Sequence, residues 1–105
     1  MADEASEKLQ AELERLQARA IDAMKQAMYM VQADTQQLCP VKTGNLKRSY
    51  TSGVDQDGNI ITGWVGSDCE YAVWVDQKQP HLTAAVEKDQ AQVTELIRKA
   101  LTPEQ

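Results

Sequence analysis

The chain has 105 residues, of which 42% are hydrophobic, and its 16 acidic residues outnumber its 11 lysines and arginines, giving a net charge of -5. This length predicts a single domain over residues 1–105. The shortage of aromatic residues, 5% with no phenylalanine, predicts a thin core. An acidic chain is poorly suited to neutralising phosphates, which disfavours general nucleic-acid binding. The charged N-terminus and the lack of any ~20-residue apolar run lead us to expect neither a signal peptide nor a membrane span.

Residues 6–38 carry the clearest pattern, an apolar stripe with steps of three or four residues. Its members are Leu9, Leu13, Leu16, Ala20, Met24, Ala27, Val31, Thr35 and Leu38. This spacing predicts an α-helix, which Pro40 ends because proline disfavours helical geometry at the residue before it. At 1.5 Å per residue the helix would be ~50 Å long. Because that exceeds the width of a compact domain of this size, we expect part of it to project or to pack on another subunit.

Residues 50–79 show the signals of an antiparallel sheet. Two short segments rich in β-branched and aromatic residues, YTSGV and NIITGWVG, flank a turn over residues 55–59. The Asp-Gly pair in that turn is typical of a hairpin. Alternation would place Ile60, Thr62 and Trp64 on one face of the second strand.

Residues 66–80 are compatible with a third strand or an irregular segment, because Tyr71, Val73 and Val75 alternate with Ala72 and Trp74. We favour the third strand. Residues 80–101 then show a helical apolar stripe that ends with Arg98 and Lys99, cations suited to the negative end of the helix dipole. The predicted fold class is α+β, with a long N-terminal helix, a small antiparallel sheet built on a β-hairpin and a C-terminal helix.

Catalytic and metal-binding patterns are missing from the sequence. His81 is the single histidine, and Cys39 and Cys69 lack the close spacing of zinc ligands. No serine lies in a Gly-x-Ser-x-Gly context, and the Lys-Thr-Gly run at 42–44 lacks phosphate-loop spacing. We therefore expect no enzymatic activity, no catalytic residues, no metal and no cofactor.

The segment 39–49, between the long helix and the sheet, reads CPVKTGNLKRS. Gly44-Asn45 permits a tight turn, and Thr43 or Asn45 can cap a turn beginning at Leu46. A connecting loop needs no cations, so Lys47 and Arg48 are left without a structural explanation. From the residues alone, an exposed connecting loop and a contact surface are both open interpretations.

The same segment resembles the signature of a siphophage tail-component family, the small proteins that complete the tail or join it to the head. The matching residues are Pro40, Val41, Lys42, Thr43, Gly44, Leu46, Lys47, Arg48 and Ser49. A second motif of the family resembles the run Tyr71–Asp76, and a third resembles Pro80, Leu82 and Ala85. Together the likeness extends over residues 8–101.

The resemblance implies a phage or prophage structural protein, made in the bacterial cytoplasm and located in the neck or tail of the virion. It further implies a homo-oligomeric ring, such as a hexamer, that contacts head–tail connector or tail tube proteins. The candidate subunit interface comprises Lys42, Thr43, Gly44, Leu46, Lys47, Arg48, Tyr71, Trp74 and Asp76. We expect its cations to meet acidic residues of a neighbour, such as Glu87 and Asp89, or of a connector protein. A DNA-contacting module, which is possible but not favoured, and a minor capsid-associated protein are the alternatives.

Overall fold

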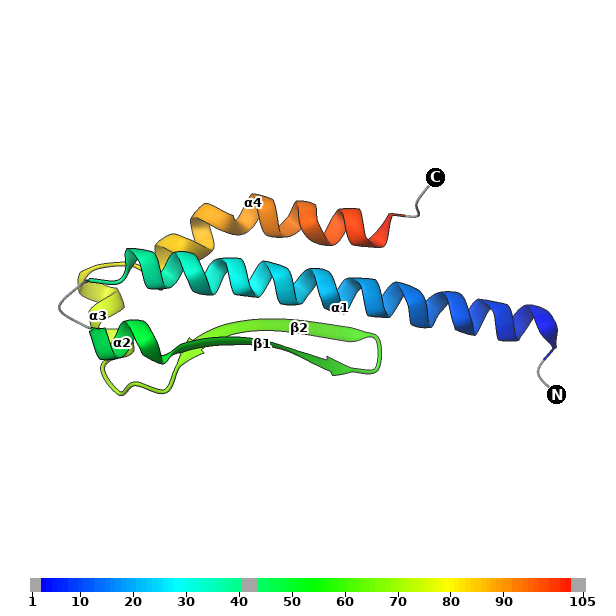
Figure 1. Cartoon of the computed structure of the whole chain (residues 1–105), viewed down its shortest axis with the longest axis horizontal. Coiled ribbons are helices and arrows are strands. Elements are labelled where there is room, and N and C mark those ends of the chain that lie inside the picture. Colours follow the sequence, from blue (N-terminus) through cyan, green and yellow to red (C-terminus); the bar gives the residue numbers. More distant parts are fainter. Residues whose placement is uncertain (1–2, 41–43, 103–105) are drawn as a thin grey trace.

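The structure is a computed structural model that describes residues 3–40 and 44–102. The molecule is elongated, with extents of 61 × 27 × 17 Å (Figure 1). A long helix runs the whole length, and a β-hairpin and a second long helix lie along it. This arrangement confirms the predicted α+β class with its N-terminal helix, antiparallel hairpin and C-terminal helix.

Helix α1 spans Glu4–Leu38, beginning two residues before the predicted start and ending where predicted. Asp3 caps its N-terminus by accepting a hydrogen bond from the Ser6 backbone N–H at 2.8 Å. The helix buries a narrow stripe of small side chains, namely Ala20, Ala23, Ala27, Val31 and Thr35. Because these side chains are small, the neighbouring elements can approach the α1 backbone closely.

Strands β1, Tyr50–Asp57, and β2, Ile60–Ser67, form the predicted hairpin. The register runs from Tyr50 opposite Ser67 to Asp57 opposite Ile60, so the turn is shorter than the expected 55–59 and contains only Gly58 and Asn59. Gly58 has φ 60°, a conformation that glycine adopts without a steric penalty. The strands alternate as expected, with the side chains of Ile60, Thr62 and Trp64 more exposed than those of their neighbours.

Two glycines let the hairpin pack tightly. A Cβ at Gly53 would lie 2.6 Å from the ring of Trp64, its partner on the opposite strand. A Cβ at Gly63 would lie 2.6 Å from Met24 Sδ and from Met28 Cγ, so this glycine sets how closely β2 approaches α1.

The connections contain two short helices that the sequence interpretation missed. Helix α2, Gly44–Ser49, occupies most of the predicted loop 39–49. Helix α3, Ala72–Lys78, stands where the third strand was expected, so that prediction is wrong and the described part of the chain forms a two-stranded sheet. Helix α4, Leu82–Leu101, confirms the predicted C-terminal helix.

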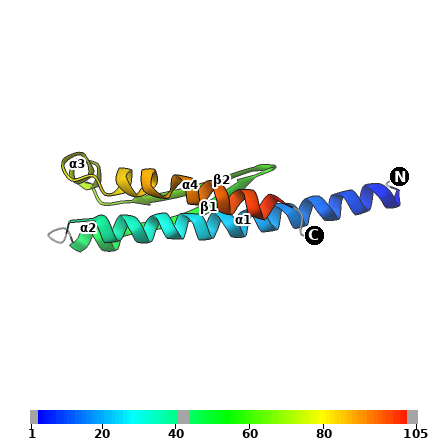
Figure 2. The same cartoon turned by 90° about the horizontal axis from the view of Figure 1, so that it is seen from above.

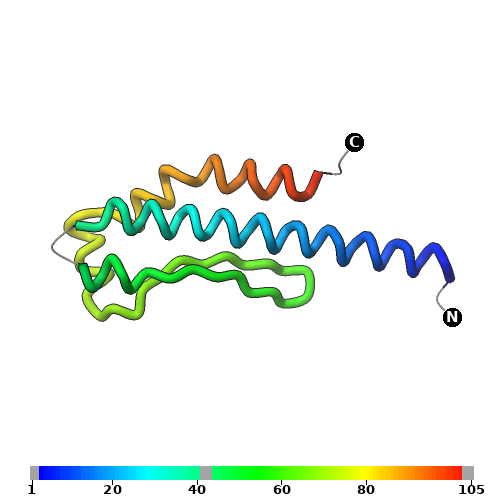
Figure 3. The backbone as a smooth tube through the Cα atoms, viewed as in Figure 1, coloured from blue at the N-terminus to red at the C-terminus, as the bar shows by residue number. Residues whose placement is uncertain are grey.

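The hairpin and α4 both pack on α1, as seen in two perpendicular views (Figures 1 and 2). Both α2 and α3 lie at one end of the molecule, and at the other end α1 extends well past the hairpin tip and α4 (Figure 3). Hydrogen bonds attach both elements to α1 near this point. Gln17 Nε2 donates to Asn59 Oδ1 at 2.8 Å, and Arg19 Nε donates to the Ala100 carbonyl at 3.1 Å. Residues of α1 before Gln17 therefore project beyond the rest of the domain.

Candidate assembly interface

Helix α2 is fixed to the core by one side chain. Leu46 is fully buried and packs with Cys39 and Tyr50, while Val65, Ala72 and Leu82 surround this cluster. With Leu46 turned inward, the adjacent Lys47 and Arg48 face solvent. The Leu-Lys-Arg order of the signature thus supplies one anchor and two exposed cations.

Neither cation of α2 forms an ion pair with any of the described residues. Arg48 Nη2 donates to Asn45 Oδ1 at 2.8 Å, and its guanidinium lies 3.4 Å from the position that a Cβ on Gly44 would take. Gln36 of α1 donates to the Lys47 carbonyl at 3.1 Å and so holds the α2 backbone. Both charges are available to a partner because nothing described in the chain neutralises them.

Helix α3 presents a second exposed surface at the same end of the molecule. Its residues Ala72 and Val75 pack toward the Leu46 cluster, which leaves Val73 and Trp74 outside, 71% and 61% exposed. Lys78 Nζ lies 4.0 Å from the centre of the Trp74 ring, a cation–π contact. We call the exposed residues Lys47, Arg48, Tyr71, Val73, Trp74 and Lys78 the α2–α3 surface. It combines large apolar side chains with positive charge.

Asp76 belongs to the interior of this end rather than to its exposed surface. Its Oδ1 accepts from the backbone N–H groups of His81 and Leu82, both at 2.9 Å, and its Oδ2 accepts from Thr83 Oγ1 at 2.6 Å. Burial favours a higher pKa for Asp76, but these hydrogen bonds outweigh it and lower the pKa below its usual range. The carboxylate therefore caps α4 from outside that helix.

His81 and Tyr50 form a buried polar pair beneath the α2–α3 surface. Tyr50 OH lies 2.6 Å from His81 Nε2, and His81 Nδ1 lies 3.0 Å from the Gln79 carbonyl. Since the carbonyl can only accept, Nδ1 donates to it and Nε2 accepts from the phenol. Burial, with smaller contributions from Cys39 and Asp76, raises the pKa of Tyr50 to about 12.

Asp89 lies between α4 and α1 and is 1% exposed, so the expected contact of Asp89 with a neighbouring subunit is wrong. Neither of its carboxylate oxygens has a hydrogen-bond donor among the described residues. Burial, and then the neighbouring Asp34 carboxyl of α1, raise the pKa of Asp89 to about 6. Lys88 Nζ lies 3.7 Å from Asp34 Oδ2 and partly offsets this effect. Glu87, the other expected contact, is exposed.

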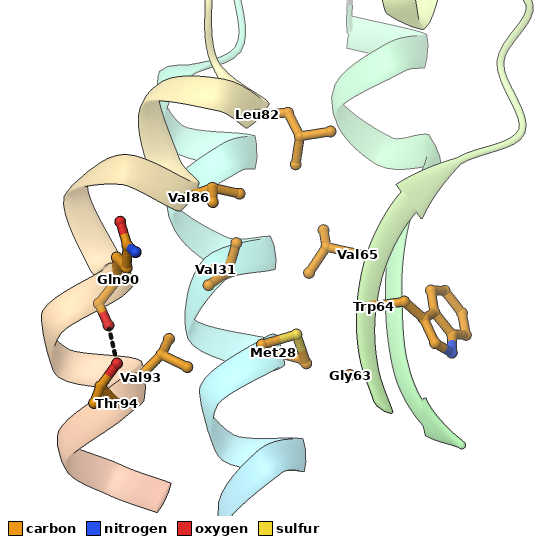
Figure 4. Close-up of a pocket in the computed structure, with 10 residues that line it drawn as sticks. All are labelled: Met28, Val31, Gly63, Trp64, Val65, Leu82, Val86, Gln90, Val93 and Thr94. Carbon is orange, nitrogen blue, oxygen red and sulfur yellow. Dashed lines mark hydrogen bonds between the residues drawn. The ribbon is translucent and has the colours of Figure 1, made fainter. Parts of the chain in front are cut away.

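An apolar groove of about 370 Å³ lies between α4 and β2, with α1 as its floor (Figure 4). Met28 and Val31 come from α1, with Met28 pointing toward β2, while Val65 points in from β2, and Val86 and Val93 line the α4 side. The Trp64 ring points to the other side of the strand, so only its backbone borders the groove. The groove contains no ionisable side chain, which makes it a packing surface rather than a site for acid–base chemistry.

The sequence-predicted interface residues thus divide into three groups. Gly44, Lys47, Arg48, Tyr71 and Trp74 lie at the α2–α3 end. Leu46 is core and Asp76 is a helix cap, while Lys42 and Thr43 lie outside the described residues. The sequence interpretation missed Val73, Lys78 and the Tyr50–His81 pair. The capping role of Asp76 was missed as well, although a signal was available. No Ser, Thr, Asp or Asn stands immediately before Leu82 to cap α4, which calls for a cap from elsewhere.

Within residues 3–40 and 44–102, no three His, Cys, Asp or Glu side chains are grouped so that they could hold a metal ion. Over the same residues, no helix is both long and apolar enough to cross a membrane.

Residues 3–77 match the sequence model of the HK97-gp10-like family, described as "Bacteriophage HK97-gp10, putative tail-component". The chain belongs to the HK97-gp10-like family. The match covers α1, α2, the hairpin and most of α3, including every described residue of the α2–α3 surface except Lys78. No curated protein and no solved structure matches the chain. As a phage tail component, this HK97-gp10-like protein is a structural protein of the virion that interacts with other virion proteins.

Proposed function

We propose that this HK97-gp10-like protein completes the phage tail or joins it to the head, acting as a neck subunit through assembly and not through catalysis. The observation that carries the proposal is the α2–α3 surface, most of whose residues belong to the motifs that resemble the family. Its anchor residue Leu46 is buried, whereas Lys47, Arg48, Val73 and Trp74 are exposed at one end of the molecule. Exposed aromatic side chains and arginine are the residue types enriched in protein interfaces.

A homo-oligomeric ring, such as a hexamer, is the form of assembly that we propose. A ring requires two different patches on each subunit, because one patch must meet another on the next copy. The molecule is elongated, with the α2–α3 surface at one end and the projecting part of α1 at the other, so it carries two distinct ends. Connector or tail tube proteins would contact the faces of the ring that the subunits leave open.

The proposal is tested in a phage or prophage whose own gene copy is inactivated and then supplied from a plasmid. Without the protein, we expect electron micrographs to show filled heads beside separate tails if it joins them. Tails of irregular length, or tails with unfinished upper ends, would indicate completion. Defective capsids would contradict both roles and would support the capsid-associated alternative.

Lys47→Glu and Lys25→Glu form a matched pair of variants for the same complementation assay. Both residues are exposed and both substitutions change the net charge equally, but Lys25 lies midway along α1, away from the α2–α3 end. We expect Lys25→Glu to restore infectious particles and Lys47→Glu to fail. Equal complementation by the two variants would contradict a contact role for the signature.

The DNA-contacting alternative is separated by a binding assay on the purified protein. With a net charge of -5, the protein should not retain duplex DNA even at low ionic strength, where phosphate contacts are strongest. Salt-dependent binding that is lost in Lys47→Glu would instead favour this alternative.

A further inference from the structure

We propose that strand β2 and the groove beside it bind an extended, uncharged segment of another virion protein, which pairs with β2 as a third strand of the sheet. The partner segment would alternate apolar side chains, directed into the groove, with side chains directed to solvent. This contact is separate from the α2–α3 surface. It requires only that the protein meets other virion proteins, not that it forms a ring or lies in the neck.

The edge of β2 that faces away from β1 has a row of unpaired backbone groups. The hairpin turn has two residues, so the pair Asp57–Ile60 next to it is hydrogen-bonded, and such pairs alternate with non-hydrogen-bonded ones along the strands. Ile61, Gly63 and Val65 therefore occupy non-hydrogen-bonded positions, with their N–H and C=O groups directed away from β1. Within residues 3–40 and 44–102, nothing donates to these carbonyls or accepts from these N–H groups.

A hydrogen bond on β1 supports this assignment. Counted from the turn in the same way, Tyr50 is a non-hydrogen-bonded position of β1. The Tyr50 carbonyl accepts from Gln32 Nε2 of α1 at 3.0 Å, as a carbonyl that points away from β2 can do. Helix α1 thus supplies a partner for an outward-facing group of β1, whereas no described residue supplies one for the outward-facing groups of β2.

Strand β2 also lacks the features that keep a sheet edge from pairing with other chains. Natural edge strands are protected by charged side chains, proline or bulges. The residues of β2 read IITGWVGS, without charge or proline, and the register with β1 contains no bulge. Strand β1, in contrast, carries Asp55 and Asp57. Because a third strand makes a two-stranded sheet more stable, the uncharged edge favours the addition of a strand.

The free edge of β2 borders the apolar groove. The part of β2 around Gly63 and Val65 lines the groove together with α4, whereas none of the residues of β1, all of them described, does (Figure 4). The free edge is therefore the edge of the sheet nearer α4. Paired residues of neighbouring strands point to the same face of a sheet, so an added strand would direct every second side chain into the groove, as Val65 does. These side chains would cover Val86 of α4, which is 48% exposed.

The chemistry of the site selects an extended apolar segment as its occupant. An α-helix pairs its backbone groups internally, so it cannot satisfy a strand edge. An extended strand presents N–H and C=O groups with the same two-residue repeat as β2. The residues that line the groove include no ionisable side chain, and burying an unpaired charge there would be costly, so the segment is uncharged. About five residues, at ~3.3 Å each, are enough to extend from Ile61 to Val65.

A second copy of this chain fits the site less well than a single strand does. In the described chain the two extended segments, β1 and β2, are joined in one hairpin, so a second copy would bring both strands together. Helix α4 forms the opposite wall of the groove, where the second of these strands would lie. A linear segment of a different virion protein brings one strand only.

A peptide array tests the inference. Overlapping peptides of ~12 residues, longer than a typical strand, cover the other virion proteins of the same phage and are probed with the purified protein. We expect binding by peptides that contain about five uncharged residues with alternating apolar side chains.

Val86→Lys and Ala91→Lys are matched variants for this array. Both residues are exposed on α4 and both substitutions add one positive charge, but only Val86 lines the groove. Circular dichroism checks that both variants keep the fold. Val86→Lys should bind the peptides at least about tenfold more weakly, because it places a charge in the groove. Ala91→Lys, and Lys47→Glu on the α2–α3 surface, should bind them as the wild type does.

Amide hydrogen exchange, followed by NMR, tests the strand edge itself. In the free protein the amides of Ile61, Gly63 and Val65 should exchange faster than those of Thr62 and Trp64, which are paired with β1, and a bound peptide should protect them. Methylation of the peptide backbone nitrogen should abolish binding at every second residue and leave it unchanged at the residues between, because only alternate N–H groups of a strand face its neighbour.

The inference is overturned if no peptide binds, if Val86→Lys binds normally, or if the three outward amides stay unprotected in the complex. Sedimentation velocity of the protein alone is the last measurement. Wild-type dimers that Val86→Lys disrupts would assign the edge to a second copy and would equally contradict the inference. The complementation assay judges the tail role independently of all these results.

Discussion

The buried carboxyl of Asp89 makes the stability of this protein depend on pH in a direction opposite to that of most acidic side chains. Asp89 is 1% exposed, has no hydrogen-bond donor among the described residues and lies against Asp34. Replacing it with asparagine keeps the shape, removes the buried charge and supplies an amide that can donate to Asp34. We therefore expect Asp89→Asn to stabilise the fold at neutral pH.

The size of the effect follows from the pKa of Asp89, which rises from its ordinary value of 3.8 to about 6. At 1.36 kcal/mol per pKa unit, the ionised carboxyl costs about 3 kcal/mol of unfolding free energy. A raised carboxyl pKa means that the native state binds more protons than the unfolded chain between these two values. The cost is therefore absent below pH 4, grows as the pH rises and is complete above pH 6.

Thermal unfolding at pH 7.5 and pH 4 measures this prediction. At pH 7.5 the midpoint of Asp89→Asn should lie about 14 °C above that of the wild type, and at pH 4 the two should coincide. Asp22→Asn, an exposed substitution on α1, serves as the control and should shift neither midpoint. The reasoning is refuted if Asp89→Asn fails to stabilise the protein at pH 7.5, or if it stabilises it equally at both pH values.

Three further substitutions test hydrogen bonds and packing in the interior of the domain. Asp76→Asn should destabilise the protein by about 1–2 kcal/mol at pH 7, because the α4 cap loses its charge, and the loss should disappear as the pH falls through the lowered pKa of Asp76; a loss that persists in acid would contradict the capping role. Tyr50→Phe should cost about 1–3 kcal/mol in urea unfolding, since it leaves the buried His81 Nε2 without its donor, and an unchanged midpoint would show that the bond contributes nothing. Gly63→Ala should lower the thermal midpoint, at a cost of about 1 kcal/mol, because its Cβ meets flexible methionine side chains of α1. Gly66→Ala, which meets nothing within 4 Å, is the control, and equal shifts for both would refute the close-approach argument.

The parts of the fold that were predictable from the sequence are those that neighbouring residues determine. The stripe from Leu9 to Val31 and the stop at Pro40 specify α1, and the Asp-Gly turn specifies the hairpin. Helix α3 escaped prediction because its seven residues contain β-branched and aromatic side chains that also suit a strand. Packing decides the outcome, since Ala72 and Val75, one helical turn apart, both contact the Leu46 cluster.

The polar interior could not be predicted because its partners lie far apart in the chain. Tyr50 and His81 are 31 residues apart, and no local pattern links them. In the sequence, Asp76 resembles an exposed interface residue. Only the fold brings it next to the start of α4, which it caps. Asp89 lies within an ordinary polar stretch of a helix, and only the approach of Asp34 from α1 shows that it is buried. The exposed cations Lys47 and Arg48, by contrast, were identifiable as a candidate contact from the signature alone.

The groove between α4 and β2 has a consequence for how the molecule opens. The Tyr50–His81 bond and the Leu46 cluster join the hairpin to the start of α4. Beyond them the two elements each pack on α1 and are separated by the groove, so their far ends can separate from α1 without first displacing each other. Native-state hydrogen exchange should then show two cooperative units that open independently, with the shared part of α1 protected until both have left. In the subunit, the hairpin and α4 would then be two elements whose far ends open independently on a shared central helix, α1.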